Sequence, residues 1–526
     1  MLTPDRTCRE MFEPKLRADF SGSFRCWDHV LCIASCLAFY SAFCFGVLGE
    51  KVVSPAMGGL WEEVILQLPK LAAAVDPMVK ADQEPESLAG TGPAAQPALV
   101  ALAQSASYAA TEGVLGSKLD PAILSRVDAL VRKITDLVIE VRRDIHANPE
   151  LANREVRTSR VVAEHLRRFG IAEIQTGVAH HGVVALIRGR KPGPVIALRA
   201  DMDALPIVEE TGLPFASKNP GVMHACGHDA HTAMLLGAAA VFAELRDELP
   251  GTVKLIFQPA EEGVPPGEEG GARLMIAQGV LENPRPQAIF AQHVHLELPT
   301  GQIGYRAGGL MAAVDRFQLT VIGKQSHAAM PWAGFDPIVA SAHIIAAMQT
   351  IVSRRIDTRK PVVVSFGKIR AGEAWNIIPE KVELEGTIRT HDPHVRELAR
   401  TELQRIAEQV AAGLGTTAQL SLYDYGPVVW NDPRLLARVM PALQLAVGAD
   451  NVVEVEPVMG GEDFAHYAQE VPGLYIFLGA RNESIGAIHP VHTPKMIIDE
   501  AVLPIGVRTM CLVALQFMAS HSTGSP

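Results

Sequence analysis

Residues 194–203 read PVIALRADMD, residues 232–249 read TAMLLGAAAVFAELRDEL, and residues 252–262 read TVKLIFQPAEE. A short apolar run is followed by a long segment with apolar residues at helical spacing, and then by a second short apolar run. This alternation predicts a strand, a helix and a strand of a layered α/β domain. The runs GVVALIRG (182–189) and QAIFAQHVH (287–295) continue the same pattern on either side.

The pattern changes near Gly308. Segments 315–324, 361–372 and 381–390 alternate apolar and polar residues as antiparallel strands do, and segments 337–352 and 394–414 have helical spacing. After Tyr425 the α/β pattern returns. We therefore predict a two-domain α/β fold class, a layered α/β domain with an inserted smaller α+β domain. The predicted boundaries are 122–310 and 425–522 for the layered domain and 311–424 for the insertion.

Residues 1–121 are predicted to be an extension. Its segment 29–49 has no charged residue and is long enough to cross a bilayer, and residues 70–120 are rich in Ala and Pro, as in a linker. Three interpretations of the apolar segment stay open: a signal-anchor that tethers the protein to a membrane, a signal peptide, or a start placed too early in front of a cytosolic enzyme. Localisation therefore stays open between the cytoplasm and a compartment outside it.

Composition excludes some classes of protein. The formal net charge of -11 argues against a nucleic-acid binder, which would carry a basic face. Five of the seven cysteines lie in the first 50 residues, which leaves Cys226 and Cys511 for the rest of the chain. A disulfide scaffold is therefore excluded for the body.

Pairs of chemically active side chains follow the predicted strands. Their members are Asp201 and Asp203, Cys226 and His228, Glu261 and Glu262, His293 and His295, and, near the C-terminus, His489 and His492. Functional sites of open α/β sheets gather at the carboxyl ends of strands. Thiolate, imidazole and carboxylate together suit a transition metal better than Mg or Ca.

Each pair also has an ordinary structural interpretation. Cys226 alone would be a small buried side chain, Glu261 and Glu262 a solvated turn, and Asp229 a helix N-cap. The occurrence of all these pairs at strand ends of one chain favours a metal site.

Several motifs together resemble a known family. They are RADMDALP (199–206), MHACGHDAH (223–231), QPAEEG (258–263), SHAAMPW (326–332), NIIP (376–379) and GGEDF (460–464). They resemble the metal-dependent amidohydrolases of the aminoacylase and carboxypeptidase clan, in the branch of hippurate hydrolases, N-acyl-amino-acid amidohydrolases and auxin–amino-acid conjugate hydrolases. The resemblance covers about residues 122 to 520.

The resemblance implies a site with two divalent transition metal ions, Mn or Zn, with Co or Ni as alternatives. The implied ligands are Cys226 as the bridge, His228, Glu262, His293 and His492, with the choice between His293 and His295 open. It implies Glu261 as general base, Asp203 as the aspartate that orients a ligand, and His327 as the histidine that stabilises the transition state. Asn376 either assists His327 or binds the carboxylate of the product. Two further assignments have alternatives: Arg389 either pairs with a substrate carboxylate or is an exposed strand residue, and Glu462 and Asp463 either lie near the metals or cap a helix.

The activity implied by the resemblance is hydrolysis of the amide bond of N-acyl amino acids, with a small-molecule substrate and no nucleic acid. A dipeptidase or exopeptidase of the same clan and a catalytically silent binding protein are the alternatives. Cys226 favours the acyl-amino-acid branch because the peptidase branch usually has Asp at that position. In this clan the inserted domain acts as a lid and dimerisation domain, so we also expect a homodimer.

Overall fold

The computed structural model describes residues 119–521. The apolar segment 29–49 and almost all of the linker expected at 70–120 lie outside the described residues. Within residues 119–521, one helix, α12 (Val502–His521), is long and apolar enough to cross a membrane, and 94% of its apolar window is buried inside the protein.

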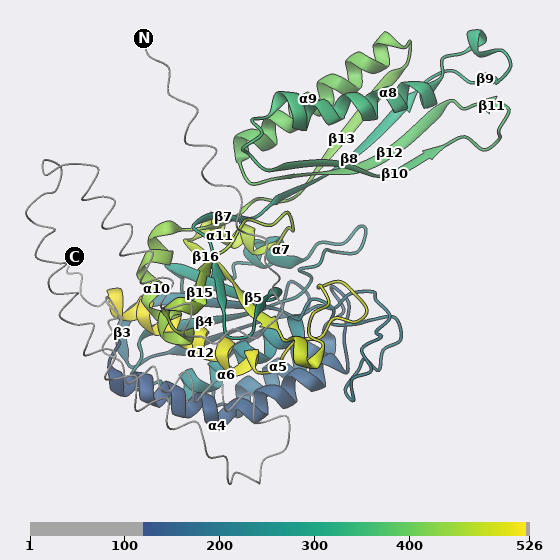
Figure 1. The fold of residues 1–526 in the computed structure, drawn as a ribbon. Coiled ribbons are helices and arrows are strands. Elements are labelled where there is room, and N and C mark those ends of the chain that lie inside the picture. The colour runs from purple at the N-terminus through teal and green to yellow at the C-terminus, as the bar shows by residue number, and fades with distance from the viewer. Residues whose placement is uncertain (1–118, 522–526) are drawn as a thin grey trace, which may run out of the picture. The chain divides into compact units, whose positions relative to one another are not determined.

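An eight-stranded sheet forms the centre of the larger domain (Figure 1), and its strand order is β1-β2-β4-β3-β5-β16-β6-β15. The strands are β1 (Glu173–Val178), β2 (Gly182–Arg188), β3 (Lys191–Asp201), β4 (Pro250–Gln258), β5 (Ala288–Pro299), β6 (Ile303–Tyr305), β15 (Val452–Glu454) and β16 (Gly473–Arg481). The neighbours β4, β3, β5 and β16 run parallel. Their carboxyl ends therefore meet at one edge of the sheet.

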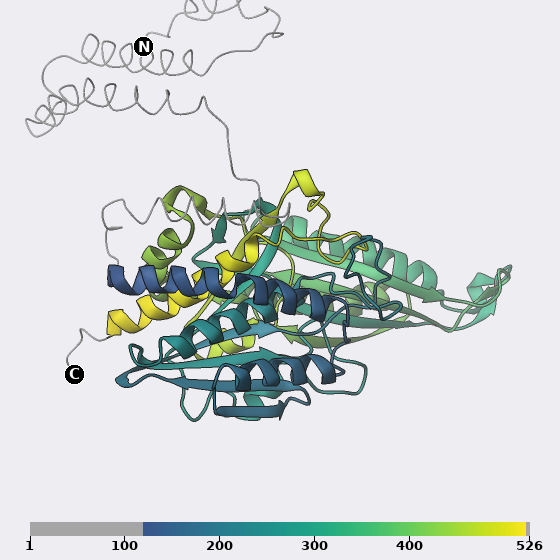
Figure 2. The ribbon, with the colours of Figure 1, turned by 90° about the horizontal axis from the view of Figure 1, so that it is seen from below.

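Helices cover both faces of this sheet. They are α4 (Pro121–His146), α5 (Val156–Arg168), α6 (His228–Glu244), α7 (Gly271–Ala277), α10 (Pro433–Val447), α11 (Phe464–Glu470) and α12. On one face α4, α6 and α12 pack against one another (Figure 2), and α7 and α11 contribute to the core on the other face. Successive residues of a strand point to opposite faces, so Leu198 enters the first core and Ala197 the second.

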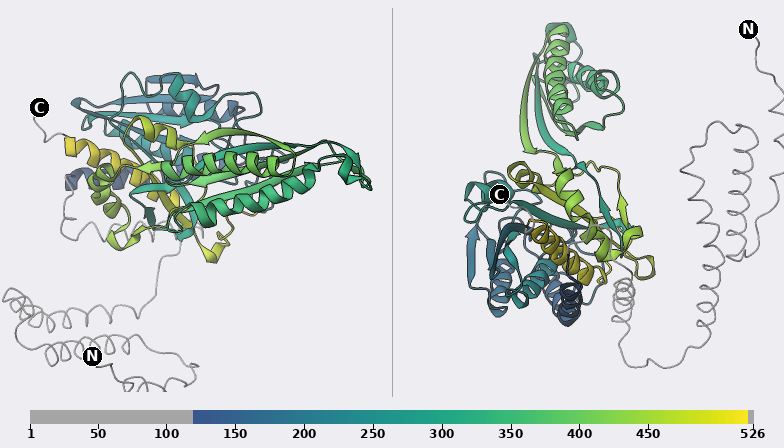
Figure 3. Two further views of the ribbon diagram at one scale, coloured as in Figure 1. Left: turned by 90° about the horizontal axis from the view of Figure 1, so that it is seen from above. Right: turned by 90° about the vertical axis from the view of Figure 1, so that its left-hand side faces the viewer.

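The smaller domain is an insertion between β7 (Gly308–Met311) and β14 (Val429–Asn431), which pair with each other. Its antiparallel sheet has the order β10-β12-β8-β13, and α8 and α9 lie side by side over one face of it (Figure 3). The elements are β8 (Ala313–Ile322), β9 (Ser326–His327), α8 (Pro337–Thr350), β10 (Val362–Ala371), β11 (Ile377–Ile378), β12 (Lys381–Thr390), α9 (Pro393–Gly413) and β13 (Thr417–Gly426). We call residues 313–426 the small domain.

The short strands β9 and β11 pair with each other at the tip of the small domain. β8 starts next to β7 and ends four residues before β9. Ten residues of β-strand span roughly 30 Å, so the tip is separated from the larger domain by about that length of sheet.

The predicted fold class is confirmed: a layered α/β domain carries an inserted smaller α+β domain. Two local expectations differ from the structure. The helix predicted over 337–352 continues as a π-helical turn, Ile351–Arg355, in which Ile356 N–H donates to Ile351 O (3.2 Å) and both isoleucines reach the core. His295 was expected to end its strand, but β5 runs on to Pro299 because its pairing with β16 continues to Arg481.

Candidate metal centre

The residues implicated by the sequence converge around the start of α6. Cys226 lies directly before this helix, and the N-cap Gly227 has a φ of 87°. A Cβ at Gly227 would lie 2.4 Å from Val294, so only glycine fits the turn that presents Cys226 and His228.

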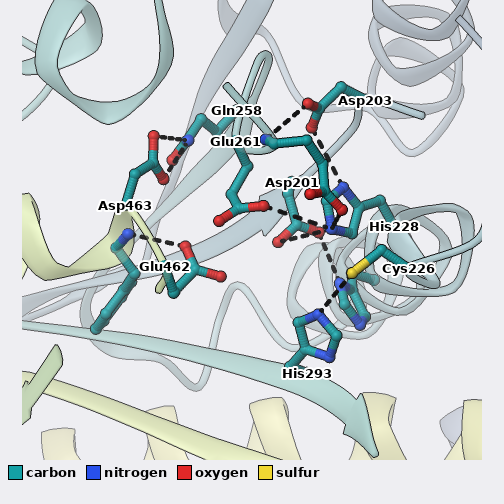
Figure 4. Close-up of polar contacts among 12 residues, drawn as sticks. Asp201, Asp203, Cys226, His228, Gln258, Glu261, His293, Glu462 and Asp463 are labelled. Atoms are coloured by element: carbon teal, nitrogen blue, oxygen red, sulfur yellow. Dashed lines mark hydrogen bonds and ion pairs between the residues drawn. The ribbon is translucent and has the colours of Figure 1, made fainter. Parts of the chain in front are cut away.

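Two histidines from distant segments meet the sulfur of Cys226. Nε2 of His293, on β5, lies 3.3 Å from Sγ, and Nε2 of His492 lies 3.3 Å from the same atom (Figure 4 shows the first contact). A backbone hydrogen bond fixes the loop of His492 next to Cys226, because the N–H of His492 donates to Ala225 O (2.7 Å). Cys226 is buried.

His228 is oriented from one side and unpartnered on the other. Its Nδ1 lies 3.2 Å from Oδ1 of Asp203, whose Oδ2 accepts the N–H of Glu262 (3.0 Å). Its Nε2 lies 3.8 Å from Oε2 of Glu261 (Figure 4). The same Nε2 lies 3.9 Å from Oε1 of Glu262. This Nε2 is buried without a hydrogen-bond partner.

The arrangement of these donors fits two metal ions. Cys226, His228 and His293 form one trio and Cys226, Glu262 and His492 another, and in each trio the ligand atoms lie within 4.8 Å of one another. The trios share Cys226. Buried polar atoms normally have partners, yet His228 Nε2 has no hydrogen bond here, and Oε1 of Glu262 has only Nε2 of His492, the other ligand of its trio, at 3.1 Å. A cation bound by each trio would satisfy them.

The pKa values of the buried side chains indicate that the centre would be stabilised by added positive charge. Burial, together with the charges of Glu262 and Glu261, raises the pKa of Cys226 well above its usual value. Burial, with Glu462 and Glu262, likewise raises the pKa of Glu261. Burial opposes protonation of His228, yet Asp201 and Asp203 raise its pKa to about 10. Bound divalent cations reverse this balance, and a coordinated thiol is deprotonated outright.

A buried network of charged side chains lies next to Glu261. Arg199 is fully buried and donates to Asp201 (2.6 Å), Glu462 (3.0 Å) and Asp463 (3.0 Å). Burial raises the pKa of Asp463 to about 7 in spite of Arg199. Glu462 and Asp463 therefore both bind the buried guanidinium of Arg199, and their carboxylates lie within 4.8 Å of that of Glu261; none of Arg199, Glu462 and Asp463 forms part of the two trios that share Cys226.

The helix-capping interpretations can also be assessed. Asp463, the N-cap of α11, makes no side-chain capping bond, whereas Glu462 accepts the N–H of Phe464 (2.8 Å). Asp229 does not cap α6 but binds Arg142 (2.7 Å) and His146 (2.9 Å) in the core.

The sequence analysis missed two buried members of the centre. Arg199 is a charged residue within an otherwise apolar strand segment, and this departure from the pattern could have indicated a buried charge at the site. His231 donates from Nδ1 to Asp201 (2.6 Å) and accepts the N–H of Val294 at Nε2 (2.9 Å), next to His293. One helical turn separates His231 from His228, which is the signal that could have identified it.

The other expected histidines lie elsewhere. His295 stacks on Phe477 with 4.4 Å between ring centroids, so His293 and not His295 faces Cys226. His489 is exposed.

His327 and Asn376 lie together at the tip of the small domain. Ala328 N–H donates to Asn376 O (3.0 Å), and His327 pairs with Ile377 in the two-stranded sheet of the tip (β9, β11). His327 is exposed. Within residues 119–521, no hydrogen bond or ion pair joins either side chain to the metal trios. The structure therefore does not bring these two residues to the centre of the same chain.

Arg389 lies at the base of the small domain, on β12. Its Nε donates to Thr387 Oγ1 (3.0 Å), and its Nη1 would be 3.4 Å from a Cβ on Gly461, so it lies beside the GGEDF turn. Among the described residues no carboxylate pairs with it. Burial lowers its pKa.

This fold and cluster define a class of metal-dependent hydrolase, and comparison with known proteins agrees. The family described as "Peptidase family M20/M25/M40" matches residues 197–516 of this chain. The chain belongs to this family.

Individual relatives match over most of the chain. "Thermostable carboxypeptidase 2" of Saccharolobus solfataricus is 43% identical and is matched over 74% of this chain and 97% of its own length. "N-acetylcysteine deacetylase" of Bacillus subtilis is 42% identical over 70% of this chain and 93% of its own. The crystal structure of the Bacillus subtilis YXEP protein, described as a dinuclear metal binding peptidase from the M20 family, has a TM-score of 0.64 and 38% identity, and it covers 74% of this chain and 99% of that one.

Proposed function

We propose that the protein is a metal-dependent amidohydrolase that cleaves the amide bond of N-acyl amino acids at a site for two divalent transition metal ions. The observation that carries this proposal is the pair of ligand trios that share Cys226, with Glu261 beside them. His228 and His293 complete one trio, and Glu262 and His492 complete the other. Mn and Zn are the metals that suit this donor set, with Co or Ni as alternatives.

Glu261 is the proposed general base. Bound metal ions would lower the pKa of a water molecule and polarise the scissile carbonyl. Glu261 belongs to neither of the trios that share Cys226, and its Oε2 lies 3.8 Å from Nε2 of His228, so it is free to take a proton from that water and deliver it to the leaving amine.

Asp203 is the proposed orienting residue. It holds His228 through Nδ1 and so directs Nε2 toward the ligand trios. The same carboxylate accepts the N–H of Glu262, so it fixes one ligand from each trio.

Arg389 is the proposed partner of the substrate carboxylate. It is half-buried, lies beside the GGEDF turn, and has no carboxylate partner among the described residues. A free carboxylate is common to N-acyl amino acids and to peptides with a free C-terminus. The two relatives described above, a carboxypeptidase and a deacetylase, fit both kinds of substrate.

His327 and Asn376 are proposed to act in a homodimer. The tip carries exposed apolar side chains around them, Trp332 (79% exposed), Trp375 (95%) and Phe335 (51%). An apolar patch of this kind marks a surface that is covered in the working assembly. Because the length of the small-domain sheet separates the tip from the centre of its own chain, His327 would stabilise a transition state in a second copy or after a large movement of the small domain.

The test is the variant Glu261→Gln, assayed with metal supplementation against a panel of N-acetyl and N-benzoyl amino acids and of dipeptides. We expect kcat to fall by about 10²- to 10⁴-fold, while KM and the bound metal stay close to those of the native protein. Glu297→Gln is the matched control, because Glu297 is an exposed glutamate at the end of β5 (88% side-chain exposure). Unchanged turnover in the Glu261 variant would refute the proposal.

The second candidate function is a carboxypeptidase or dipeptidase, and the 43% identity to the carboxypeptidase favours it. The same substrate panel separates the two. Faster hydrolysis of dipeptides than of N-acyl amino acids would replace the first proposal by the second, and no hydrolysis of either by metal-loaded protein would indicate a binding protein.

A further inference from the structure

The turn that presents Glu261 has an unusual backbone. Ala260, the residue before Glu261, is buried and has a φ of 57°. A residue with a Cβ pays roughly 1–2 kcal/mol in this left-handed region, so the conformation must be held by its surroundings. Glu261 and Glu262 take their directions from this turn.

The group that holds Ala260 is the carboxylate of Glu155. Glu155 precedes α5, is fully buried, and accepts the N–H of Ala260 at Oε1 (2.9 Å). The same oxygen accepts the N–H of Asn153 (3.1 Å), which also has a left-handed backbone, with a φ of 58°. One side-chain oxygen therefore fastens two strained turns that lie more than 100 residues apart in sequence.

A second carboxylate holds the other side of the same turn. The N–H of Glu262 donates to Oδ2 of Asp203 (3.0 Å). The backbone is thus anchored immediately before and immediately after Glu261, whose own side chain is left free to face the ligand trios. Asp203 also contacts the ligand His228, whereas Glu155 contacts no proposed metal ligand side chain.

We propose that Glu155 is a positioning residue, which sets the direction of the Glu261 side chain by holding the left-handed turn at Ala260. This inference rests on the proposed function of Glu261 as the base. Glu155 touches neither metal nor substrate, so its effect is on the rate of the chemical step and not on binding.

The chemistry of Glu155 makes the proposal testable with a conservative variant. Burial, together with the charge of Asp203, raises the pKa of Glu155 to about 8. Its Oε2 is buried without a hydrogen-bond partner. What the turn needs is therefore one acceptor oxygen at the position of Oε1, and the side-chain amide of glutamine supplies such an oxygen while alanine does not.

The experiment compares Glu155→Ala, Glu155→Gln and the control Glu150→Ala in the full-length, metal-loaded protein. Glu150 is a carboxylate of the same segment, and it accepts the N–H groups of Arg157 (3.0 Å) and Thr158 (2.9 Å) at the start of α5 without contacting the Glu261 turn. We expect Glu155→Ala to lower kcat about 100-fold with KM and metal content within threefold of native, because a displacement of about 1 Å costs that much. Glu155→Gln and Glu150→Ala should keep kcat within threefold.

A second readout does not depend on activity. In the metal-free protein, amide hydrogen exchange over residues 257–263 should quicken at least tenfold in Glu155→Ala and stay native in the other two variants. Native kcat in Glu155→Ala, an equal loss in Glu155→Gln, or the same loss in Glu150→Ala would each overturn the proposal. If Glu261→Gln leaves turnover unchanged, the function proposed for Glu261 fails instead, while faster exchange in Glu155→Ala would still show that Glu155 holds the turn.

Discussion

Replacing Asp203 by asparagine tests whether the centre depends on a residue that is not itself a metal ligand. Asp203 is 1% exposed and uses both oxygens: Oδ1 lies 3.2 Å from His228 Nδ1, and Oδ2 accepts the N–H of Glu262 at 3.0 Å. Asparagine has nearly the same volume but only one acceptor oxygen. Its NH₂ group must therefore face one of the two N–H donors, so His228 or Glu262 loses its support.

The size of the effect follows from these two bonds. A hydrogen bond to a charged group contributes about 1.5–3 kcal/mol. Removal of a side chain that orients a metal ligand typically lowers metal affinity 10- to 100-fold, or about 1.4–2.8 kcal/mol. The two estimates agree. We therefore expect Asp203→Asn to bind Zn or Mn about 10- to 100-fold more weakly than the native protein.

The measurement is competition between the metal-free protein and a chromophoric chelator, followed by activity at increasing metal concentration. Activity lost by Asp203→Asn should return in large part at saturating metal, because the ligands themselves remain. Asp128→Asn is the control, since Asp128 is also a buried aspartate (8% exposed) but binds Arg508 (2.7 Å) on α12. Native metal affinity in Asp203→Asn, or equal weakening in both variants, would refute the reasoning.

Three further predictions concern the ligand His293, the arginine Arg389 and the buried His466 of α11. His293→Ala should lose at least one of two bound ions by elemental analysis, whereas His295→Ala should keep both, because His295 stacks on Phe477 and does not face the sulfur; equal loss would contradict the assignment. Arg389→Met should raise KM about 10- to 100-fold for substrates with a free carboxylate, the worth of a charge-assisted hydrogen bond, and leave carboxyl-amidated analogues unaffected. Burial lowers the pKa of His466 to about 4 from an ordinary 6.5, so between these pH values the unfolded chain binds a proton that the folded chain does not. The free energy of unfolding should therefore decrease as the pH falls from about 6.5 to 4, by up to about 3 kcal/mol. In urea titrations at pH 7 and pH 4.5, the His466→Gln variant should lose less stability between the two pH values than the native protein.

The strands of the large sheet could be predicted because their apolar runs are short and bounded by polar pairs. The structure places the pair Glu261 and Glu262, which follows β4, next to Cys226 and His228, as the carboxyl-edge argument expects. The prediction that Cys226 and His228 also follow a strand is wrong, because β3 ends at Asp201 and this pair lies at the start of α6. That argument depends only on strand direction, which is why it needs no knowledge of side-chain packing. It could not place His492, which reaches Cys226 from a loop 266 residues away.

Other members of the site could not be predicted because they act through single, non-local contacts. Nothing in the spacing around Glu155 indicates that its carboxylate binds Ala260, and a left-handed alanine has no signature in sequence. The position of His327 is a different case. Its motif implied a catalytic role but gave no information about its position in the fold. The pairing of β9 with β11 is what places His327 at the tip of the small domain.

The buried charges explain why metal and catalytic turn must be considered together. Arg199 pairs with Asp201, Glu462 and Asp463. The carboxylate of Glu261 lies within 4.8 Å of those of Glu462 and Asp463, and also of that of Glu262. Arg199 alone cannot balance so many buried carboxylates, and unpaired buried charge is costly. The turn at Ala260 holds Glu261 and Glu262 in place despite this repulsion, through amides bound to Glu155 and Asp203. The backbone therefore keeps the acidic side chains at the positions where divalent ions would bind. The ions would neutralise carboxylates that are already in place, and their binding would not require these side chains to move.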